Sequence, residues 1–521
     1  MKSTIIRIST GFIFAIVLVA FSGMVFAASS QPKYGGTLKI IVNGDVTSMG
    51  YIPDQISPWD YYQRTPAIET LVRYDVKKQE VVPFLAKAIL QDPKANTITF
   101  NLRKGVKFHD GTVLDAKAVE WNLEEIRKSA NLGASWLSAS SIELKDDYTV
   151  VVHFHTWDNT FLRNMAWDSG MISPTAFKKN GLDWARQHAV GTGPFKQVSF
   201  QRDVKKVFER FDGYWQKGKP YLDRIEIKVI KDPTVQIAAF LRGEGDMIEN
   251  VNAKYVHSLE GKPNVLLIKD KILGNLWSLA PNSANPDTPF ANLKVRQAMS
   301  YAIDSKAIAK FLLYGQARAV NQLVVPEAWS YNPEVKGYPY NPEKAKALLK
   351  EAGYPNGFST TLYFSSDSMV AKVFTAVQGY LAAVGIKAQP EMLNTGKYGE
   401  MYYATGWSSG IFAPDMLAYP EIGIMTRYFF EAASPLGLPK SLAHPEDLEA
   451  VLKRFVSTPD FETQKKLAQK AQYLLTDKYC LYTPLIIMPG VTAKYAYVKS
   501  ANPRIVGPRS VYSFADEWID K

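Results

Sequence analysis

The chain has 521 residues, of which 46% are apolar and 21% charged, a composition typical of a globular protein with more than one domain. Its formal net charge is +11, but lysine and arginine are scattered and form no arginine-rich arm or basic stripe, which argues against a nucleic-acid partner. The single cysteine, Cys480, excludes an internal disulfide, and its apolar neighbours indicate a buried structural thiol.

The N-terminus predicts export. Lys2 and Arg7 flank an apolar run over residues 8–25, and Val25 and Ala27 place small residues before a cleavage site after Ala27. Residues 1–27 therefore predict a signal peptide, and the alternative is an uncleaved membrane anchor, because the run is close to the length that spans a bilayer. No cysteine stands at the cleavage site for a lipid anchor, so we expect a free periplasmic protein.

The first elements of the exported chain are a turn and a buried strand over residues 34–42. A polar loop follows over residues 43–62, and loops that leave a buried strand often carry binding residues. Beyond it, the pattern predicts a short helix over residues 66–74 and the start of another at residues 83–86. The candidate ligand contacts in the loop are its large aromatic side chains: Tyr51, Trp59 and Tyr61.

Residues 97–126 predict a strand, a second short strand and a helix, separated by turns. Asp115 is placed to cap the helix. The buried positions repeat every second residue in the strands and every three or four residues in the helix: Ile98, Phe100, Leu102, Val106, Phe108, Val119, Leu123 and Ile126.

Two patterns further along suggest ligands and have simpler explanations. His153 and His155 share one face of a predicted strand over residues 148–154 and could chelate a metal, but no third ligand is near in sequence, so a solvated strand face is the alternative. The glycine-rich residues 191–195 resemble a phosphate loop, yet Pro194 and Phe195 enter a strand and not a helix, so no anion site is predicted.

Later segments alternate helices and strands. A strand over residues 225–229 precedes a helix that starts at Asp232 and ends before Gly243. Asn292 and Asn341 are placed to cap two further helices. One long helix is predicted over residues 446–476, followed by a strand at residues 485–488.

The run FNLRKGVKFHDG and the capped helix after it closely resemble the signature segment of the extracellular solute-binding proteins of family 5, the peptide, nickel and sugar receptors of ABC importers. Four further segments resemble sequence motifs of the same family, at residues 71–86, 191–195, 293–304 and 341–357.

This resemblance implies an α/β fold of the two-lobed periplasmic binding protein type, of the large kind with an extra small domain, and a ligand cleft between hinged lobes. Lobe I would comprise residues 34–78, 195–273 and 488–521, the small domain residues 79–194, and lobe II residues 274–487. The implied function is a receptor that delivers a peptide-like or other small organic solute to an inner-membrane permease with its ATPase. We expect a monomer without cofactor or resident metal; an oligosaccharide or a nickel complex is the alternative solute.

The resemblance also indicates site residues in lobe II. Peptide-binding members carry an acid three residues after a Gly-Trp pair, which binds the peptide's amino group; here that position is Gly410, so Asp415 is the candidate replacement, with a structural turn as the alternative. Trp407 and Trp277 are the other expected contacts in this lobe. Trp136 and Trp167 are candidates in the small domain. Arg163 could pair with a ligand carboxylate, but a solvated arginine is the expected alternative.

An enzyme is not expected. Residues 406–410 match G-x-S-x-G, the pattern of a hydrolase nucleophile, which would make Ser408 catalytic. Pro414 opposes the helix that should follow such a serine, and nothing marks the downstream His444 as its base, so the hydrolase is a remote alternative.

Overall fold

The computed structural model describes residues 31–55, 58–75, 77–129, 132, 136–419, 422–500 and 513–521. The predicted signal peptide lies outside these residues. Within them, no helix combines the length and apolar character needed to cross a membrane.

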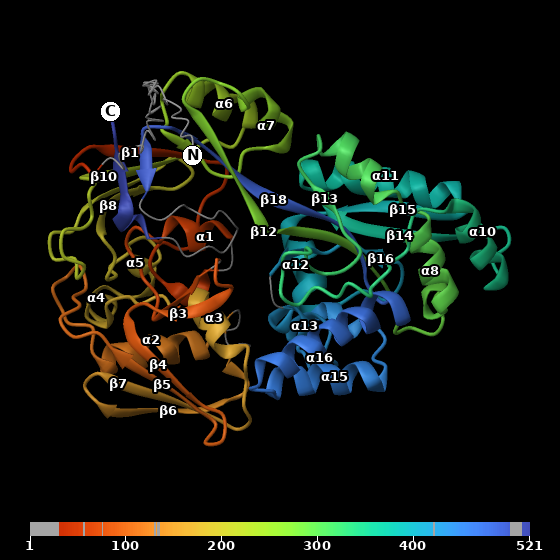
Figure 1. Ribbon diagram of the computed structural model, residues 1–521, viewed down its shortest axis with the longest axis horizontal. Helices are drawn as coiled ribbons and strands as arrows, with labels where there is room; N and C mark the ends of the chain where they lie inside the picture. The colour runs from red at the N-terminus through yellow and green to blue at the C-terminus, as the bar shows by residue number, and fades with distance from the viewer. Residues whose placement is uncertain are drawn as a thin grey trace, which may run out of the picture.

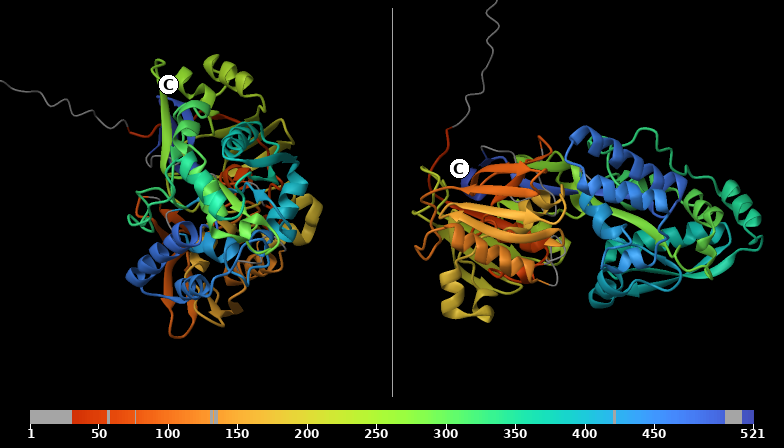
Figure 2. Two further views of the ribbon diagram at one scale, coloured as in Figure 1. Left: turned by 90° about the vertical axis from the view of Figure 1, so that its right-hand side faces the viewer. Right: turned by 90° about the horizontal axis from the view of Figure 1, so that it is seen from below.

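The chain forms two lobes, as the resemblance predicts (Figures 1 and 2). One sheet of twelve strands extends through both. In the first lobe the sheet contains both parallel and antiparallel pairs. The order of the strands across it is β11 (Met247–Ile248), β1 (Thr37–Val42), β10 (Arg224–Val229), β9 (Lys205–Arg210) and β8 (Phe195–Gln201). The helices α6 (Pro233–Leu241) and α7 (Ala253–Leu259) pack beside it, and Asp232 caps α6 as predicted, accepting from the Val235 N–H at 2.9 Å.

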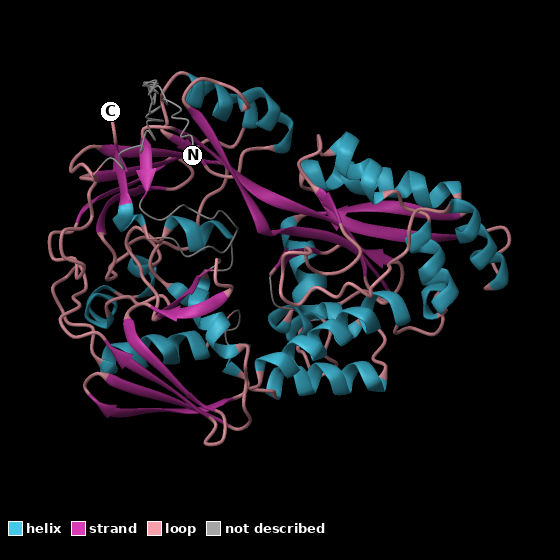
Figure 3. Ribbon diagram, viewed as in Figure 1, coloured by secondary structure: helices cyan, strands magenta, loops and turns pink. Residues whose placement is uncertain are grey.

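The small domain is a separate four-stranded antiparallel sheet with a helix on one face (Figure 3). Ile98, Phe100 and Leu102 are fully buried in the second of its strands, and Asp115 caps α2 (Ala116–Arg127), so both predictions are confirmed. The short strand expected at Val106 and Phe108 is reduced to one bridge, Lys107 to Val113. The strands are β4 (Ala86–Asp92), β5 (Thr97–Leu102), β7 (Thr149–Phe154) and β6 (Ala139–Asp146), followed by α3 (Phe161–Asp168), α4 (Pro174–Asn180) and α5 (Leu182–Ala185).

The helices predicted over residues 66–74 and from residue 83 are wrong. The chain instead forms the hairpin of β2 (Val72–Asp75) and β3 (Glu80–Pro83), in which Val72 pairs with Pro83. Ile68, Leu71 and Val72 are all buried, so the segment has no polar face for a helix to present to water.

In the second lobe, α11 (Ser368–Ala383) packs on the parallel strands β14 (Phe358–Ser365) and β15 (Ile386–Leu393). The caps predicted at Asn292 and Asn341 are confirmed. The other elements are α8 (Leu293–Tyr301), α9 (Ser305–Ala307), β13 (Arg318–Ala319), α10 (Pro342–Glu351), α12 (Thr395–Glu400), β16 (Ile411–Phe412), β17 (Asp415–Ala418), α13 (Gly423–Phe429), α14 (Gly437–Lys440), α15 (Glu446–Ser457) and α16 (Phe461–Tyr473).

The single helix predicted over residues 446–476 is wrong, because two helices occupy this range. Pro459 follows the end of α15, and Asp460 begins α16 by accepting a hydrogen bond from the Thr463 N–H at 2.8 Å. Cys480 is buried, and burial raises the pKa of its thiol, in agreement with the predicted structural role.

Two long antiparallel strands, β12 (Val265–Pro281) and β18 (Thr483–Tyr495), connect the lobes (Figure 1). Their register shifts between Lys269 and Gly274, where the pairing is irregular, and a Cβ at Gly274 would lie 2.6 Å from the Met488 carbonyl oxygen. The boundaries predicted at residues 273/274 and 487/488 coincide with this irregular part of the ribbon, and they stay a prediction.

Candidate ligand site between the lobes

Asp415 lies at the start of β17, paired across the sheet with Trp277 of β12. The backbone N–H of Asp415 donates to the Tyr398 hydroxyl at 2.8 Å, and that hydroxyl donates to the Ala413 carbonyl at 3.3 Å. We call Asp415, Trp277 and Tyr398 the acidic centre. Its backbone positions are set by strand pairing, so the carboxylate is held on a rigid element and not on a loose turn.

The carboxyl group of Asp415 is costly to ionise. Its pKa is raised to about 7, first by burial and then by the negative charge of Asp367, while the indole N–H of Trp277 acts in the opposite direction. That N–H is close enough to act on the carboxylate without making a hydrogen bond of ordinary geometry. Among the described residues no lysine, arginine or histidine forms a salt bridge with Asp415, so a cation on a ligand would offset the cost of burying its charge.

Gly410 explains why the family's usual acid is absent here. The residue has φ = +87°, and a Cβ at this position would lie 2.6 Å from the Thr361 carbonyl oxygen on β14. An aspartate would therefore be strained and would clash with the neighbouring strand.

Trp407 and Trp277 both lie in hydrophobic cores of the structure. The Trp407 ring is 6% exposed and stacks on Phe412 with ring centroids 4.9 Å apart. Ser441 fixes its backbone, accepting from the Trp407 N–H and donating to the Trp407 carbonyl oxygen, both at 2.8 Å. The indole N–H of Trp407 is buried and has no hydrogen-bond partner within the described part of the chain, so a ligand or water can still use it.

Aromatic side chains from lobe I and from the small domain reach into the core of lobe II. Tyr61 of α1 (Pro58–Gln63) and Trp167 of α3 belong to the same buried cluster as Trp407 and Met416. The Tyr61 hydroxyl donates to Asp168 at 3.0 Å, and Trp167 stacks on Tyr419 with centroids 4.7 Å apart. Both lobes therefore contribute to one aromatic cluster beside the acidic centre.

Arg163 is not solvated, contrary to the prediction. Its side chain is 4% exposed, and its guanidinium carbon lies 4.0 Å from the ring centroid of Trp167 and 5.4 Å from that of Tyr419. The arginine therefore stabilises the cluster by cation–π contacts from the small-domain side.

A second group of contacts joins the small domain to the helices of lobe II. Asp158 forms a salt bridge with Arg427 of α13, and it also accepts from the Thr160 N–H at 2.9 Å and hydroxyl at 2.7 Å. Asn159 donates its backbone N–H to the Val456 carbonyl at 3.0 Å and its side-chain amide to the Thr458 carbonyl at 3.1 Å. We call Asp158, Asn159 and Arg427 the interlobe contact. No local sequence pattern marked these residues, because 269 positions separate the two charges.

The remaining candidates lie elsewhere. The Tyr51 hydroxyl donates to Glu125 of α2 at 2.9 Å, and its ring stacks on Phe177. Trp136 is 3% exposed in the core of the small domain, edge-on to Phe161. Neither contacts the aromatic cluster in the described structure, and the side chain of Trp59 lies outside the described part.

The geometry around Ser408 is the reverse of a nucleophile elbow. The serine is exposed, and it follows a helical turn over residues 401–405 and precedes β16, whereas an elbow needs a strand before and a helix after. His444 is hydrogen-bonded to Glu449 at 2.8 Å and to the Pro439 carbonyl at 3.0 Å.

His153 lies 2.7 Å from Glu143 across the small sheet, and His155 is exposed. Over the described ranges, no group of three or more histidine, cysteine, aspartate and glutamate side chains is arranged to hold a metal ion.

Comparisons with known proteins agree with this architecture. Residues 80–421 match the family model "Bacterial extracellular solute-binding proteins, family 5 Middle". The chain is 31% identical to the glutathione-binding protein GsiB of Pectobacterium atrosepticum, over 84% of this chain and 86% of that protein. It is 28% identical to heme-binding protein A of Haemophilus influenzae, over 78% of this chain and 79% of that protein. Among solved structures, it is similar to the periplasmic binding protein DppA of Helicobacter pylori in complex with the peptide STSA, with a TM-score of 0.81 and 26% identity over 94% of this chain and 99% of that one.

Proposed function

Because the chain belongs to family 5 of the bacterial extracellular solute-binding proteins, a family of receptors and not of enzymes, we propose that it captures a small peptide-like solute with a free ammonium group between its lobes. It delivers this solute to the permease of an ABC importer. Two relatives support a peptide-like solute. One is named for glutathione, and the other has a solved structure in complex with the peptide STSA.

The observation that carries this proposal is the unusual environment of Asp415. A half-buried carboxylate without a salt-bridge partner among the described residues is expensive for a protein to keep, and the neutral form is favoured at pH values below about 7. A solute ammonium placed beside Asp415 and Trp277 would make the charged form favourable. The same pairing would select against solutes that lack an amine.

Binding proceeds by a shift between open and closed lobes. A solute that touches the acidic centre of lobe II together with Tyr61 of lobe I and Trp167 of the small domain contacts both sides only when the lobes are closed. Solute binding thereby stabilises the closed form, which docks on the permease. The receptor acts as a monomer without covalent chemistry, and the partner ATPase supplies the energy of transport.

The first test is native mass spectrometry of the protein purified from the periplasm without refolding. A bound mass in the range of a small peptide supports the proposal. A saccharide or a metal complex as the retained ligand would contradict it and would favour the alternative solutes of the family.

Calorimetry then tests the amine directly. Glutathione and small peptides are compared with their N-acetylated forms, which have the same shape but no α-ammonium group. We expect acetylation to weaken binding by about 100-fold, equivalent to about 2.7 kcal/mol. Equal affinities for the two forms would show that Asp415 does not recognise an amine.

A further inference from the structure

The charged groups around Asp415 restrict what can lie next to the ammonium group of a solute. Asp415 is half-buried, so its carboxylate is within reach of a solute. Among the described residues, the one charged side chain that shifts the pKa of Asp415 is another acid, Asp367, at the start of α11. The acidic centre therefore carries negative charge that no cation of the described chain offsets.

The polar groups beside Asp415 are neutral hydrogen-bond donors. Trp277, its partner across the strands, has a buried indole N–H without a hydrogen-bond partner in the described part of the chain. Tyr402 and Trp407 pack against Phe412, with ring centroids 5.9 and 4.9 Å from its ring, and the Tyr402 hydroxyl and the Trp407 indole N–H are buried without a partner in the same part of the chain. Such donors suit an acceptor on the solute, and a neutral carbonyl oxygen needs no counter-charge.

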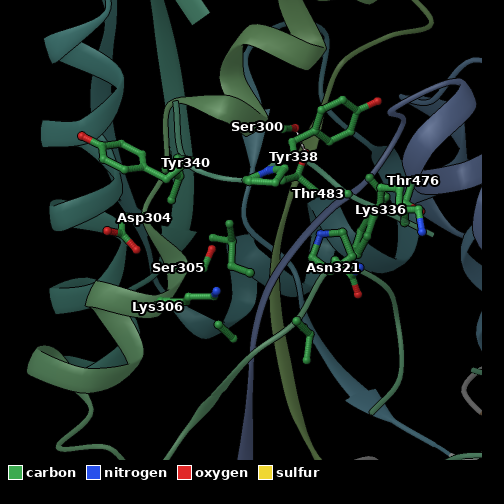
Figure 4. A pocket seen from close by; sticks show the side chains of 18 residues that line it. Ser300, Asp304, Ser305, Lys306, Asn321, Lys336, Tyr338, Tyr340, Thr476 and Thr483 are labelled. Carbon is green, nitrogen blue, oxygen red and sulfur yellow. Dashed lines mark hydrogen bonds between the residues drawn. The ribbon is translucent and has the colours of Figure 1, made fainter. Parts of the chain in front are cut away.

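The neighbouring cavity supplies no cation to the acidic centre. A pocket of about 520 Å³ adjoins it at Tyr482, whose pKa is raised first by burial and then by the charge of Asp415 (Figure 4). Two lysines, Lys306 and Lys336, line this pocket. Neither lysine, nor Arg163 of the aromatic cluster, is among the charges that act on the pKa of Asp415. A carboxylate placed beside Asp415 would therefore have no cation from these residues.

Peptide-like solutes differ in the group that lies next to their ammonium. In an α-linked peptide, the carbon that bears the ammonium also bears a neutral amide carbonyl. In a γ-glutamyl peptide that carbon bears a carboxylate, because the chain continues from the side chain of the glutamate. With the ammonium on Asp415, this carboxylate would lie close to the Asp415 carboxylate, and the repulsion between the two charges would cancel part of the attraction.

We propose that the acidic centre selects α-linked peptides over γ-glutamyl peptides. This inference rests on the proposed function and makes its solute class more specific. The ammonium group binds the carboxylate of Asp415, and the adjacent amide carbonyl accepts from the neutral donors of this region. A carboxylate in place of that carbonyl brings a further negative charge to a site where two acids act and no cation of the described residues is paired with Asp415.

Isomeric tripeptides test this selection. The peptides α-Glu-X-Gly and γ-Glu-X-Gly have the same atoms and the same net charge, and they differ only in which carboxyl group of the glutamate forms the amide bond. Pairs with alanine, serine, leucine or phenylalanine at X are compared by calorimetry, together with the N-acetylated α-linked forms. In the pair that binds best, we expect the α-linked isomer to bind about 10-fold more tightly or better.

Asp415→Asn separates charge from shape. The asparagine keeps the size of the side chain and removes its charge, so the ratio of the two affinities should fall to within about 2-fold of unity. Asp304→Asn is the matched control, because Asp304 caps α9 through the Ala307 N–H at 2.9 Å, a role that asparagine can keep, and it does not act on the pKa of Asp415. This control should keep the ratio of the unmodified protein. An unchanged ratio in Asp415→Asn would show that shape discriminates between the isomers, and it would overturn the proposal.

The outcomes distinguish this inference from the proposed function. If acetylation weakens binding while the two isomers bind equally, or the γ-linked isomer binds more tightly, the inference fails and the proposed function stands. If acetylation leaves binding unchanged, or if no peptide of the set binds, the proposed function fails and the inference fails with it.

Discussion

Asp158 lies where the small domain meets lobe II, Asp415 lies within lobe II beside the shared aromatic cluster, and the surroundings of these two acids differ. Asp158 is fully buried and has a salt bridge to Arg427 together with two hydrogen bonds from Thr160. Asp415 has the indole N–H of Trp277 nearby, and no cation of the described residues pairs with it. The first acid has a cation within the protein, whereas the second has none among the described residues.

This difference separates two tasks of a hinged receptor. The interlobe contact joins the small domain to α13 and α15 through protein groups alone, so it stabilises the closed form whether or not a solute is present. In the acidic centre, ionisation of the Asp415 carboxyl group is unfavourable until a cation lies beside it. Under the proposed function, solute-dependent closure depends on the acidic centre, and the interlobe contact determines the free energy of closure without solute.

The largest effect is expected from breaking the interlobe contact. Arg427→Met leaves Asp158 buried without its cation, which should destabilise the closed form by about 3 kcal/mol and weaken solute binding by about 100-fold. Small-angle scattering without solute should show a larger radius of gyration. Removing both charges in Asp158→Asn with Arg427→Met should cost less than the single change, because no charge is left unpaired.

Arg454→Met is the control for this prediction, because Arg454 is an exposed arginine on α15 that forms no salt bridge with the described residues. If Arg427→Met leaves both scattering and solute affinity at the values of the unmodified protein, the interlobe contact does not hold the lobes together.

The next effect is expected from the acidic centre. Asp415→Asn keeps the shape of the side chain but removes its charge, so affinity for an amine-bearing solute should fall by about 50-fold, or about 2.3 kcal/mol, while the solute-free protein is at least as stable as before. Calorimetry and thermal unfolding measure the two quantities.

Asp367→Asn is the matched control, since Asp367 raises the pKa of Asp415 and caps α11 through the Met369 N–H at 3.0 Å, a role that asparagine can keep. This variant should retain solute affinity within a few-fold. A loss as large as that of Asp415→Asn would mean that general negative charge, and not the position of Asp415, attracts the solute.

The last prediction concerns the pH dependence of the free energy of unfolding. The pKa of Asp415 is raised from 3.8 in the unfolded chain to about 7 in the folded protein, so the folded state binds more protons between these values. The free energy of unfolding should therefore fall as pH rises from 4 to 7, by at most about 1.4 kcal/mol per pH unit from this group, and should level off above 7.

Glu69 and Glu431 are also buried with pKa values raised to about 7, and they contribute with the same sign. Urea unfolding therefore gives the free energy of unfolding of the unmodified protein and of Asp415→Asn at each pH. The difference between the two values is the contribution of Asp415. Affinity for an ammonium solute should rise over the same range. Parallel pH profiles for the two proteins would show that Asp415 titrates normally.

Much of the local structure could be predicted from the sequence, because it depends on neighbours in the chain. The caps at Asp115, Asn292 and Asn341 bond to N–H groups two or three residues away, and the alternation of Ile98, Phe100 and Leu102 needs only the period of a strand. The family resemblance likewise rests on short sequence motifs, and the comparisons confirm the family.

What the sequence could not decide is where each side chain points once the lobes are packed. The segment around Val72 is a strand because Pro83 and its neighbours pair with it, and Trp407 is buried because Phe412 and Ser441 enclose it. The partners of Asp158 and Asp415 were equally hidden, because the cost of a buried charge depends on groups that are distant in the chain and near only in space. The sequence by itself therefore determined the family, the helix caps and the strand periods, whereas the tertiary structure alone decided which acid is paired with a cation and which has none among the described residues.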